Sequence, residues 1–198
     1  MNKVKPVGTN HHMPVAWHEE IETDRNVPAG HATLHEKTSI ICRMAALFLK
    51  SGSGGWRVRD AVNRTARALN VTATVSIGLT DIECTVREGA EQISQTVVIP
   101  ESGVNTNLVL DLDKFLVEID DHGYDISVTG YHLRMDEARS KKALYNPYVS
   151  GLASAAACGA FTFLLGGGLI EMICAFVGAG IGQIVRRLLL ANRINQLL

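Results

Sequence analysis

The sequence lacks most patterns that mark an enzyme, a metalloprotein or a disulfide-rich protein. Its four cysteines are scattered, with no CxxC pair and no Cys/His spacing of a zinc site, so neither a metal site nor a disulfide framework is indicated. No GxGxxG, GxxxxGKS/T, GxSxG or HExxH motif is present. The formal net charge is -1, and no basic patch with interleaved aromatics appears. We therefore expect no catalytic residue, no metal, no other cofactor and no nucleic-acid partner.

The first 35 residues lack the apolar core of a signal peptide and show no sustained periodicity. Together with the unpaired cysteines, this favours a reducing compartment for the first part of the chain. Metal binding by the histidines of this segment is one interpretation. A solvated, irregular tail over 1–35 is favoured, because ligand spacing on a fixed element is absent. The histidines are His11, His12, His18, His31 and His35.

Charge is nearly missing from one long part of the chain. Charged residues are spread over 1–142, whereas Glu171 is the only formal charge from Ala143 to Val185. This change of composition predicts a domain over 36–142 and a separate apolar region over 143–190.

The domain begins with the pattern of two helices. Thr33 and Glu36 have capping-box spacing, and Ser39 is a second possible cap. A helical stripe follows and stops at Gly52; its members are Ile41, Met44, Ala45 and Phe48. The second helix has one apolar face, formed by Val58, Val62, Thr65 and Leu69. Its arginines (Arg57, Arg59, Arg64 and Arg67) are interpreted as a solvated face rather than an anion site.

The period then changes from helical to that of strands. Val71, Ala73, Val75 and Ile77 alternate with small hydroxyl residues, which is typical of a half-buried strand. The stretches IECTVRE and QISQTVVI continue as strands, until Pro100 and Gly103 break the run.

The end of the domain is read as helical. The stretch NTNLVL (105–110) is either a short strand or an extended lead-in, and Asp111 is expected to cap a helix that ends at Gly123. The residues 125–144 are interpreted as a further helix. The fold class is therefore an α+β domain with a helix pair, a three- or four-stranded antiparallel sheet and one or two further helices.

The apolar region predicts a transmembrane hairpin. Residues 145–165 are uncharged and about as long as the ~20 residues that a span needs, and 169–187 form a second run that contains Gly178 and Gly182 in GxxxG spacing. A turn at Gly166, Gly167 and Gly168 joins the two. Both outer ends are basic, with Lys141 and Lys142 at one and Arg186, Arg187 and Arg193 at the other. This favours a cytoplasmic side for both ends, including 191–198, over a buried hairpin of a soluble protein.

Glu171 would then lie near the hairpin turn, close to the far interface of the membrane. Ionisable groups within membranes are functional candidates, and a carboxylate there could take and release a proton during transport. The alternative is an interfacial acid that only keeps the helix from slipping. Both interpretations stay open.

Two stretches carry a resemblance to a known family. The stretch RMAALFLKSGSGGWRVRDAVNRTARALNV and the stretch YNPYVSGLASAAACGAFTFLLGGGLIEMICAFVGAGIGQIVRRLL occur in this order and spacing. They are similar to the opening helix pair and the first two membrane segments of the threonine/serine exporter family. Gly52, Val58, Arg64, Ala68 and Leu69 fit the family's first motif. Gly166, Gly167 and Glu171 fit its Gly-Gly pair followed by an acid.

The resemblance covers roughly residues 38–198 and has clear implications. It implies a cytoplasmic N-terminal domain followed by several membrane helices, and export of small hydroxy amino acids driven by the proton gradient. Some members are split and work with a second membrane protein, and dicarboxylate export has been assigned to such a pair. The glutamate of the family's Gly-Ala-Glu-Ser turn falls at Gly54 here, and the sequence shows two spans where the family has more.

The leading hypothesis is therefore a component of a bacterial inner-membrane exporter of small amino acids, not an enzyme. It would be completed by a second membrane subunit or by homo-oligomerisation. The alternatives are a membrane-anchored regulatory or scaffold module, and the dicarboxylate-exporting split variant. Hydrolysis by the sheet residues Asp81, Glu83, Thr85 and Arg87 is weaker, because no nucleophile–base pair can be read among them.

Overall fold

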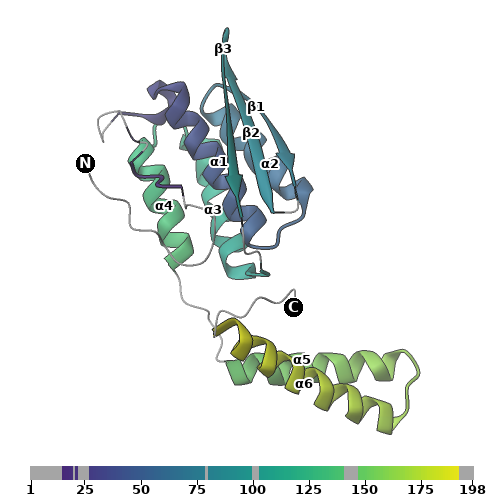
Figure 1. Cartoon of the computed structure of the whole chain (residues 1–198). Coiled ribbons are helices and arrows are strands. Elements are labelled where there is room, and N and C mark those ends of the chain that lie inside the picture. The colour runs from purple at the N-terminus through teal and green to yellow at the C-terminus, as the bar shows by residue number, and fades with distance from the viewer. Residues whose placement is uncertain are drawn as a thin grey trace. The chain divides into compact units, whose positions relative to one another are not determined.

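The computed structural model divides the chain into two compact units, Met1–Lys141 and Lys142–Leu198 (Figure 1). It describes residues 15–19, 21, 27–78, 80–99, 103–140 and 147–191, and in the last range the side chains of 148–186. The basic residues predicted to flank the hairpin at Lys141, Lys142 and Arg193 lie outside the described residues, as do His11, His12 and the segment 192–198.

The first unit is an α+β domain with a three-stranded antiparallel sheet, as predicted. The strands β1 (Thr72–Ile77), β2 (Asp81–Glu88) and β3 (Glu91–Val98) follow one another in space in the order of the sequence. Thr74 pairs with Thr85, and Thr85 pairs with Ser94. This register places most apolar residues of the strands on one face, which packs against the helices, whereas Val98 lies on the exposed face.

Four helices and one short 3-10 turn accompany the sheet in the described part of this unit. They are η1 (Ala29–His31), α1 (Leu34–Lys50), α2 (Gly55–Ala68), α3 (Thr106–His122) and α4 (Val128–Ser140). Helices α1 and α2 both pack against the sheet, and α1 contacts α2, α4, β2 and β3 (Figure 1). The core forms around it.

Helix α1 is buried on several faces, not only along its apolar stripe. The predicted apolar positions Ile41, Met44, Ala45 and Phe48 are all fully buried. Its first turn has the predicted capping box, because Thr33 accepts the Glu36 backbone N–H and Glu36 accepts the Thr33 backbone N–H. Lys37 and Arg43 are also buried, with 2 % and 3 % exposure. The periodicity of apolar residues alone could not show this.

The predicted start of α3 is wrong. The helix begins at Thr106 rather than after Asp111, and its N-cap is Asn105, whose side chain accepts the Leu108 backbone N–H at 3.1 Å. Asn is among the best N-cap residues, because its short side chain reaches the free N–H groups of the first turn. The stretch NTNLVL is therefore neither a strand nor a lead-in: it forms the cap and the first helical turns.

The described residues of the N-terminal segment pack on the domain, which differs from the expected solvated tail. Ala29 is fully buried, and Val15, Trp17 and Ile21 are partly buried against the core. A pair of backbone hydrogen bonds from Ala29 and Gly30 to the loop before α4 fixes the end of the segment.

The second unit is a helical hairpin. Helix α5 (Pro147–Leu164) and helix α6 (Leu169–Ala191) are antiparallel neighbours joined by a short turn (Figure 1). By length and composition, Leu169–Arg186 could cross a membrane, whereas Tyr148–Leu164 is a shorter apolar helix.

Candidate functional site

Gly166, Gly167 and Gly168 lie between the end of α5 and the start of α6. Gly166 has a φ of +87°, a conformation that residues with a side chain rarely adopt. At Gly167 a Cβ atom would come within 2.9 Å of the Thr162 carbonyl oxygen, which also accepts the Gly167 N–H. The turn therefore requires glycine at two successive positions, for two different reasons.

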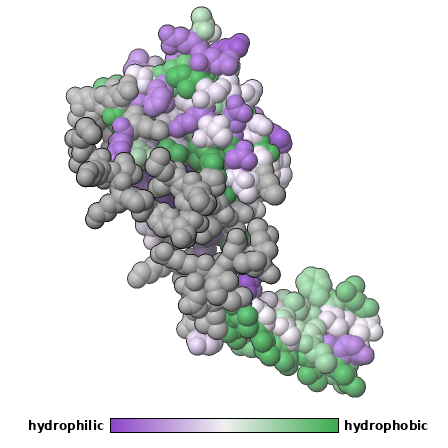
Figure 2. Space-filling model, in the orientation of Figure 1, coloured by the Kyte–Doolittle hydropathy of each residue, from purple (hydrophilic) through white to green (hydrophobic). Residues whose placement is uncertain are grey.

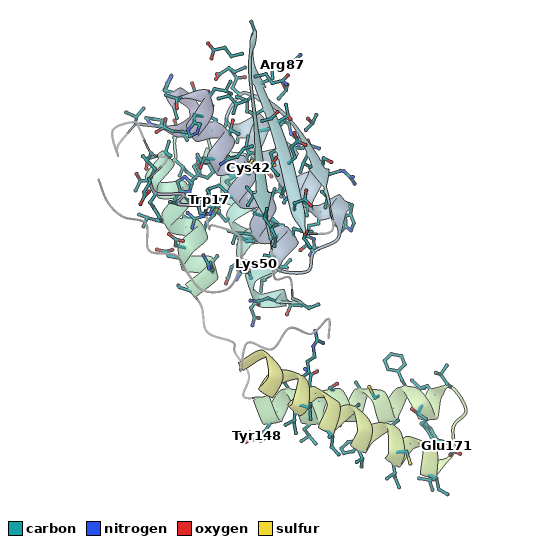
Figure 3. All side chains as sticks on the ribbon, viewed as in Figure 1. Trp17, Cys42, Lys50, Arg87, Tyr148 and Glu171 are labelled. Carbon is teal, nitrogen blue, oxygen red and sulfur yellow. The ribbon has the colours of Figure 1, made fainter. Side chains whose placement is uncertain are left out.

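Glu171 lies at the start of α6, beside this turn (Figure 3). Its side chain is exposed and folds back toward the turn, with Oε2 2.7 Å from where a Cβ on Gly168 would stand. The first turn of a helix has unpaired N–H groups and a partial positive charge, which favour a carboxylate there. Glu171 thus has a local structural reason for its position, independent of any part in transport.

The two helices of the hairpin meet along small residues. On α5 the buried residues Gly151, Ala155 and Gly159 recur every four positions and form one stripe. A Cβ at Gly151 would lie 3.3 Å from Ile184, and one at Gly159 would lie 3.5 Å from Phe176. Small residues at such positions let helix backbones approach closely, which is how helices associate in lipid.

One glycine of α6 faces α5. A Cβ at Gly180 would lie 3.3 Å from the Ala155 side chain, so Gly180 belongs to the contact. Gly178 and Gly182, which have the GxxxG spacing, are exposed and have no described atom within 4 Å of a Cβ position. Their face of α6 points away from α5.

The large apolar side chains of the hairpin point outward. Figure 2 shows hydrophobic residues over most of the visible hairpin surface, whereas the visible face of the first unit is mixed. None of the 18 residues of the apolar segment Leu169–Arg186 in α6 is buried. Soluble proteins rarely expose so continuous an apolar surface. The exposed residues are Tyr148, Val149, Leu152, Phe161, Phe163, Leu164, Leu165, Leu169, Ile170, Ile173, Phe176, Val177, Ile181 and Val185.

Three of the five residues that fit the family's first motif have clear structural roles in the first unit. Gly52, with a φ of +76°, makes the turn between α1 and α2, and Val58 is fully buried in the core. Arg64 on α2 donates from both Nε and Nη2 to the Asp120 carboxylate on α3, at 2.9 and 2.5 Å from Oδ2. These hydrogen bonds raise the pKa of Arg64. Gly54, where the family has glutamate, is the N-cap of α2 and provides no side-chain cap.

A polar cluster around the buried Arg43 in the first unit was not predicted. Arg43 on α1 donates from Nη1 toward His132 Nδ1 on α4 at 2.9 Å and from Nη2 to Asp136 Oδ1. Asp136 Oδ2 also lies 2.6 Å from His18 Nε2. The Arg43 guanidinium lies over the Trp17 ring, with Cζ 5.9 Å from the centroid of the ring. The cluster therefore ties the N-terminal segment to α1 and α4.

Burial acts differently on the two titratable partners of Arg43. Burial, followed by the charge of Arg43, lowers the pKa of His132 to about 3, so the ring is neutral at pH 7. Burial tends to raise the pKa of Asp136, but the hydrogen bond from His18 and the charge of Arg43 outweigh it, so the pKa is lowered. A neutral His132 can accept the Arg43 hydrogen bond at Nδ1, whereas a protonated one could not.

The sheet residues considered for hydrolysis form no catalytic arrangement. Thr85 shares a hydrogen bond with Ser94 at 2.8 Å, and Arg87 donates to Gln92 at 2.7 Å. Both lie on the exposed face of the sheet. Among the described residues, no group of three or more histidine, cysteine or acidic side chains could hold a metal ion.

An α+β unit followed by a hairpin with outward apolar side chains is typical of a membrane-associated protein. A family model described as "Putative threonine/serine exporter" (ThrE) matches residues 39–198. The chain belongs to this family, which is the one that its sequence motifs indicate. The family is a family of transporters, which is not an enzyme class. Comparisons with curated proteins and with solved structures gave no match.

Proposed function

We propose that the chain is a component of a bacterial inner-membrane exporter of small amino acids of the threonine/serine type. The match to the family over 39–198 carries this proposal, because it includes both the α+β unit and the hairpin. The outward apolar surface of the hairpin supports its placement in lipid.

In this proposal both helices of the hairpin span the membrane. At 1.5 Å per residue, the 23 residues of α6 extend ~35 Å and the 18 residues of α5 extend ~27 Å, against a hydrocarbon core of ~30 Å. Helix α5 is therefore short, and the residues that flank it would complete its span. Basic residues at both outer ends favour a cytoplasmic location for those ends and for the first unit.

Cysteine labelling tests this topology. A chain whose four native cysteines are replaced by alanine receives one new cysteine, either Leu165→Cys in the turn or Glu137→Cys on α4; both positions are exposed. A membrane-impermeant maleimide added to intact cells is expected to label Leu165→Cys only. After permeabilisation both variants should react. Labelling of Glu137→Cys in intact cells, or of neither variant in permeabilised cells, would contradict the proposed topology.

A solute path needs more than these two helices. The face of α6 with Gly178 and Gly182 is exposed, and small residues there allow another helix to approach closely. We propose that further membrane helices, from a second subunit or another copy of the chain, pack at this face and complete the path.

Glu171 is the proposed proton-coupling residue of the hairpin. It is the only formal charge between Ala143 and Val185, and its side chain is exposed at the start of α6. A carboxylate that exchanges a proton with the far side of the membrane could couple export to the proton gradient. The favourable position of an acid in the first helical turn is the competing explanation.

Efflux measurements separate these roles. Cells that express the chain with its genomic neighbour are loaded with labelled threonine or serine, and efflux is followed with and without a protonophore. Glu171→Gln is expected to abolish gradient-driven efflux at unchanged membrane expression. Glu137→Gln, the same change at an exposed position of α4, should have no effect. Full efflux by Glu171→Gln would contradict the coupling role and leave the structural one.

The same assay distinguishes the alternative functions. Efflux of labelled succinate but not of threonine or serine would favour the dicarboxylate-exporting variant. A chain that is in the membrane but gives no efflux of any of these solutes, alone or with its neighbour, would favour a membrane-anchored scaffold.

A further inference from the structure

The outer edge of β1 is open. In the described part of the chain β1 pairs only with β2, and the one bridge outside the three strands joins Pro28 to Ser127. Natural edge strands are protected by charged residues, proline or bulges. The six residues Thr72–Ile77 contain no charge and no proline. Their backbone can therefore accept another strand.

The apolar side of β1 is incompletely covered. Val75 and Ile77 point toward the helices but are only half-buried. The corresponding residues of the central strand, Ile82, Cys84 and Val86, are fully buried. An added strand would cover apolar surface that the helices leave exposed, which is favourable.

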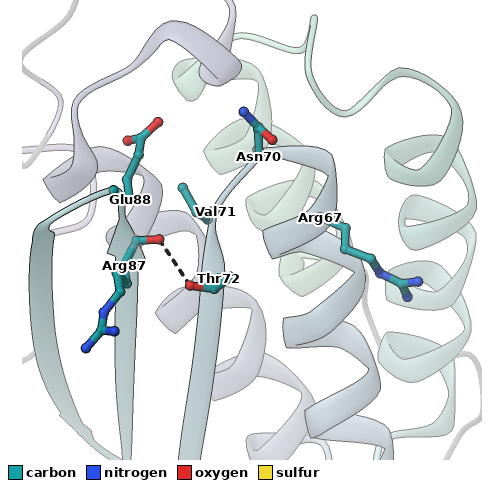
Figure 4. A pocket seen from close by; sticks show the side chains of 7 residues that line it. Arg67, Asn70, Val71, Thr72, Arg87 and Glu88 are labelled. Carbon is teal, nitrogen blue, oxygen red and sulfur yellow. Dashed lines mark hydrogen bonds between the residues drawn. The ribbon is translucent and has the colours of Figure 1, made fainter.

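A shallow hollow lies between β1 and α2, so an added strand would have protein surface beneath it. It measures ≈ 420 Å³ and is lined by Asn63, Ala66, Arg67, Val71, Thr72 and Ala73. A second hollow of ≈ 440 Å³ adjoins it at the start of β1 and shares Arg67, Val71 and Thr72 (Figure 4). In Figure 4 Arg67 extends from α2 away from β2, on the open side of β1.

A basic row on α2 runs beside this edge. Arg59, Asn63 and Arg67 are four residues apart and exposed, so they share one face of the helix. The N-terminal end of the row is close to Ile77, because a Cβ at Gly55 would contact both Ile77 and Arg59. The other end, Arg67, lines the hollow at the start of β1. The row therefore follows the whole strand.

The two arginines of this row have no carboxylate partner among the described residues, and Arg67 donates only to the Asn63 carbonyl oxygen of its own helix, at 3.3 Å. Neither Arg59 nor Arg67 forms an ion pair with a described carboxylate, whereas Arg64 pairs with Asp120 and Arg57 lies 3.9 Å from Asp113. The described surroundings of the β1 edge thus provide two free cations, one near each end of the strand.

We infer that the β1 edge binds an extended acidic segment of a partner protein, which adds to the sheet as a fourth strand and pairs two carboxylates with Arg59 and Arg67. Main-chain hydrogen bonds would give affinity, and the arginines would select the sequence. The Cα atoms of the two arginines are about 12 Å apart along the helix, which matches four residues of a strand at ~3.3 Å each. The acids are therefore expected at positions i and i+4, which face the same side of a strand.

The charges disfavour a second copy of this chain as the occupant. If β1 paired antiparallel with its own copy, the two α2 helices would become neighbours under the sheet and their basic rows would face each other. The other edge, β3, is less suited, because it begins with Glu91 and the Gln95 carbonyl oxygen already accepts the Cys42 thiol at 3.8 Å.

Hydrogen exchange tests this inference on the full chain in detergent micelles. The probe is the capped peptide Ser-Glu-Thr-Val-Thr-Glu-Ser, which places two glutamates four residues apart. At millimolar concentration it is expected to slow amide exchange over 72–77 and not over β3. The control peptide, with lysine in place of both glutamates, should give no protection.

Two variants complete the test. Arg67→Glu, at an exposed position, is expected to weaken binding of the peptide on the order of tenfold, because attraction becomes repulsion. Ala73→Pro removes a backbone donor of the open edge, because Thr74 and its alternate neighbours donate to β2, and it should also abolish protection. It can affect folding, so Arg67→Glu is decisive. No protection by the acidic peptide, equal protection by both peptides, or protection of β1 by self-association of the chain without peptide would overturn the inference.

Discussion

Replacing Arg43 with alanine is expected to lower the free energy of unfolding of the first unit by about 3 kcal/mol, a large part of the 5–15 kcal/mol typical of a domain. The side chain is 4 % exposed and binds both His132 and Asp136. Its removal leaves the buried His132 ring without its donor and leaves a cavity beside Trp17. Asp136 is partly exposed and keeps its contact with His18, so losing the ion pair with Arg43 costs less stability there.

Urea unfolding of the full chain in detergent measures this effect. Both tryptophans, Trp17 and Trp56, lie in the first unit, so their fluorescence reports on it alone. Arg67→Ala is the matched control: the same change at an exposed position should alter the free energy of unfolding by no more than about 0.5 kcal/mol. Equal stability of Arg43→Ala and Arg67→Ala would show that the buried cluster does not stabilise the fold.

Acid is expected to destabilise the first unit through His132. Its pKa is about 3 in the folded state and 6.5 in the unfolded chain, so between these values only the unfolded chain binds the proton. Stability is therefore unaffected above pH 6.5 and falls as the pH drops below it, by about 2 kcal/mol between pH 7 and pH 5. The lowered pKa of Asp136 acts in the same direction at lower pH.

A variant that cannot titrate isolates this contribution. His132→Asn keeps an acceptor near Nδ1 for Arg43 but carries no titrating ring. Between pH 7 and pH 5 the free energy of unfolding of the natural chain is expected to fall by about 2 kcal/mol more than that of the variant. The charges of Arg43, His18, Asp136 and Glu36 also act on His132 and stay the same in both chains. Parallel pH dependence in both chains would refute the role of His132.

Local patterns predicted the elements whose stability is local. The alternation of Val71, Val75 and Ile77 with hydroxyl residues predicted β1, and the spacing of Thr33 and Glu36 predicted the start of α1. These patterns depend on neighbours in the sequence, namely the strand period of two and the capping box. The start of α3 was missed because Asn105 and Asp111 are both good caps, and only the surrounding helix packing selects one of them.

The sequence singles out some residues of the hairpin. The glycine triplet and Glu171 are visible as an interruption and a lone charge in an apolar run. The glycine that contacts α5 was not predicted, because the GxxxG spacing draws attention to Gly178 and Gly182 while Gly180 faces α5. Spacing identifies residues that share a helix face, but it does not say which face meets a neighbour.

By itself, the sequence determined the family, the division into an α+β unit and an apolar region, and most helices and strands, because these depend on composition and periodicity along the chain. Only the tertiary structure decided which charges are buried and which are free. Arg43 and Arg67 both lie on helices, yet Arg43 meets His132 and Asp136 from α4, whereas Arg67 stays exposed beside β1. The partners of Arg43 lie about ninety residues away in sequence, and long-range packing alone brings them together.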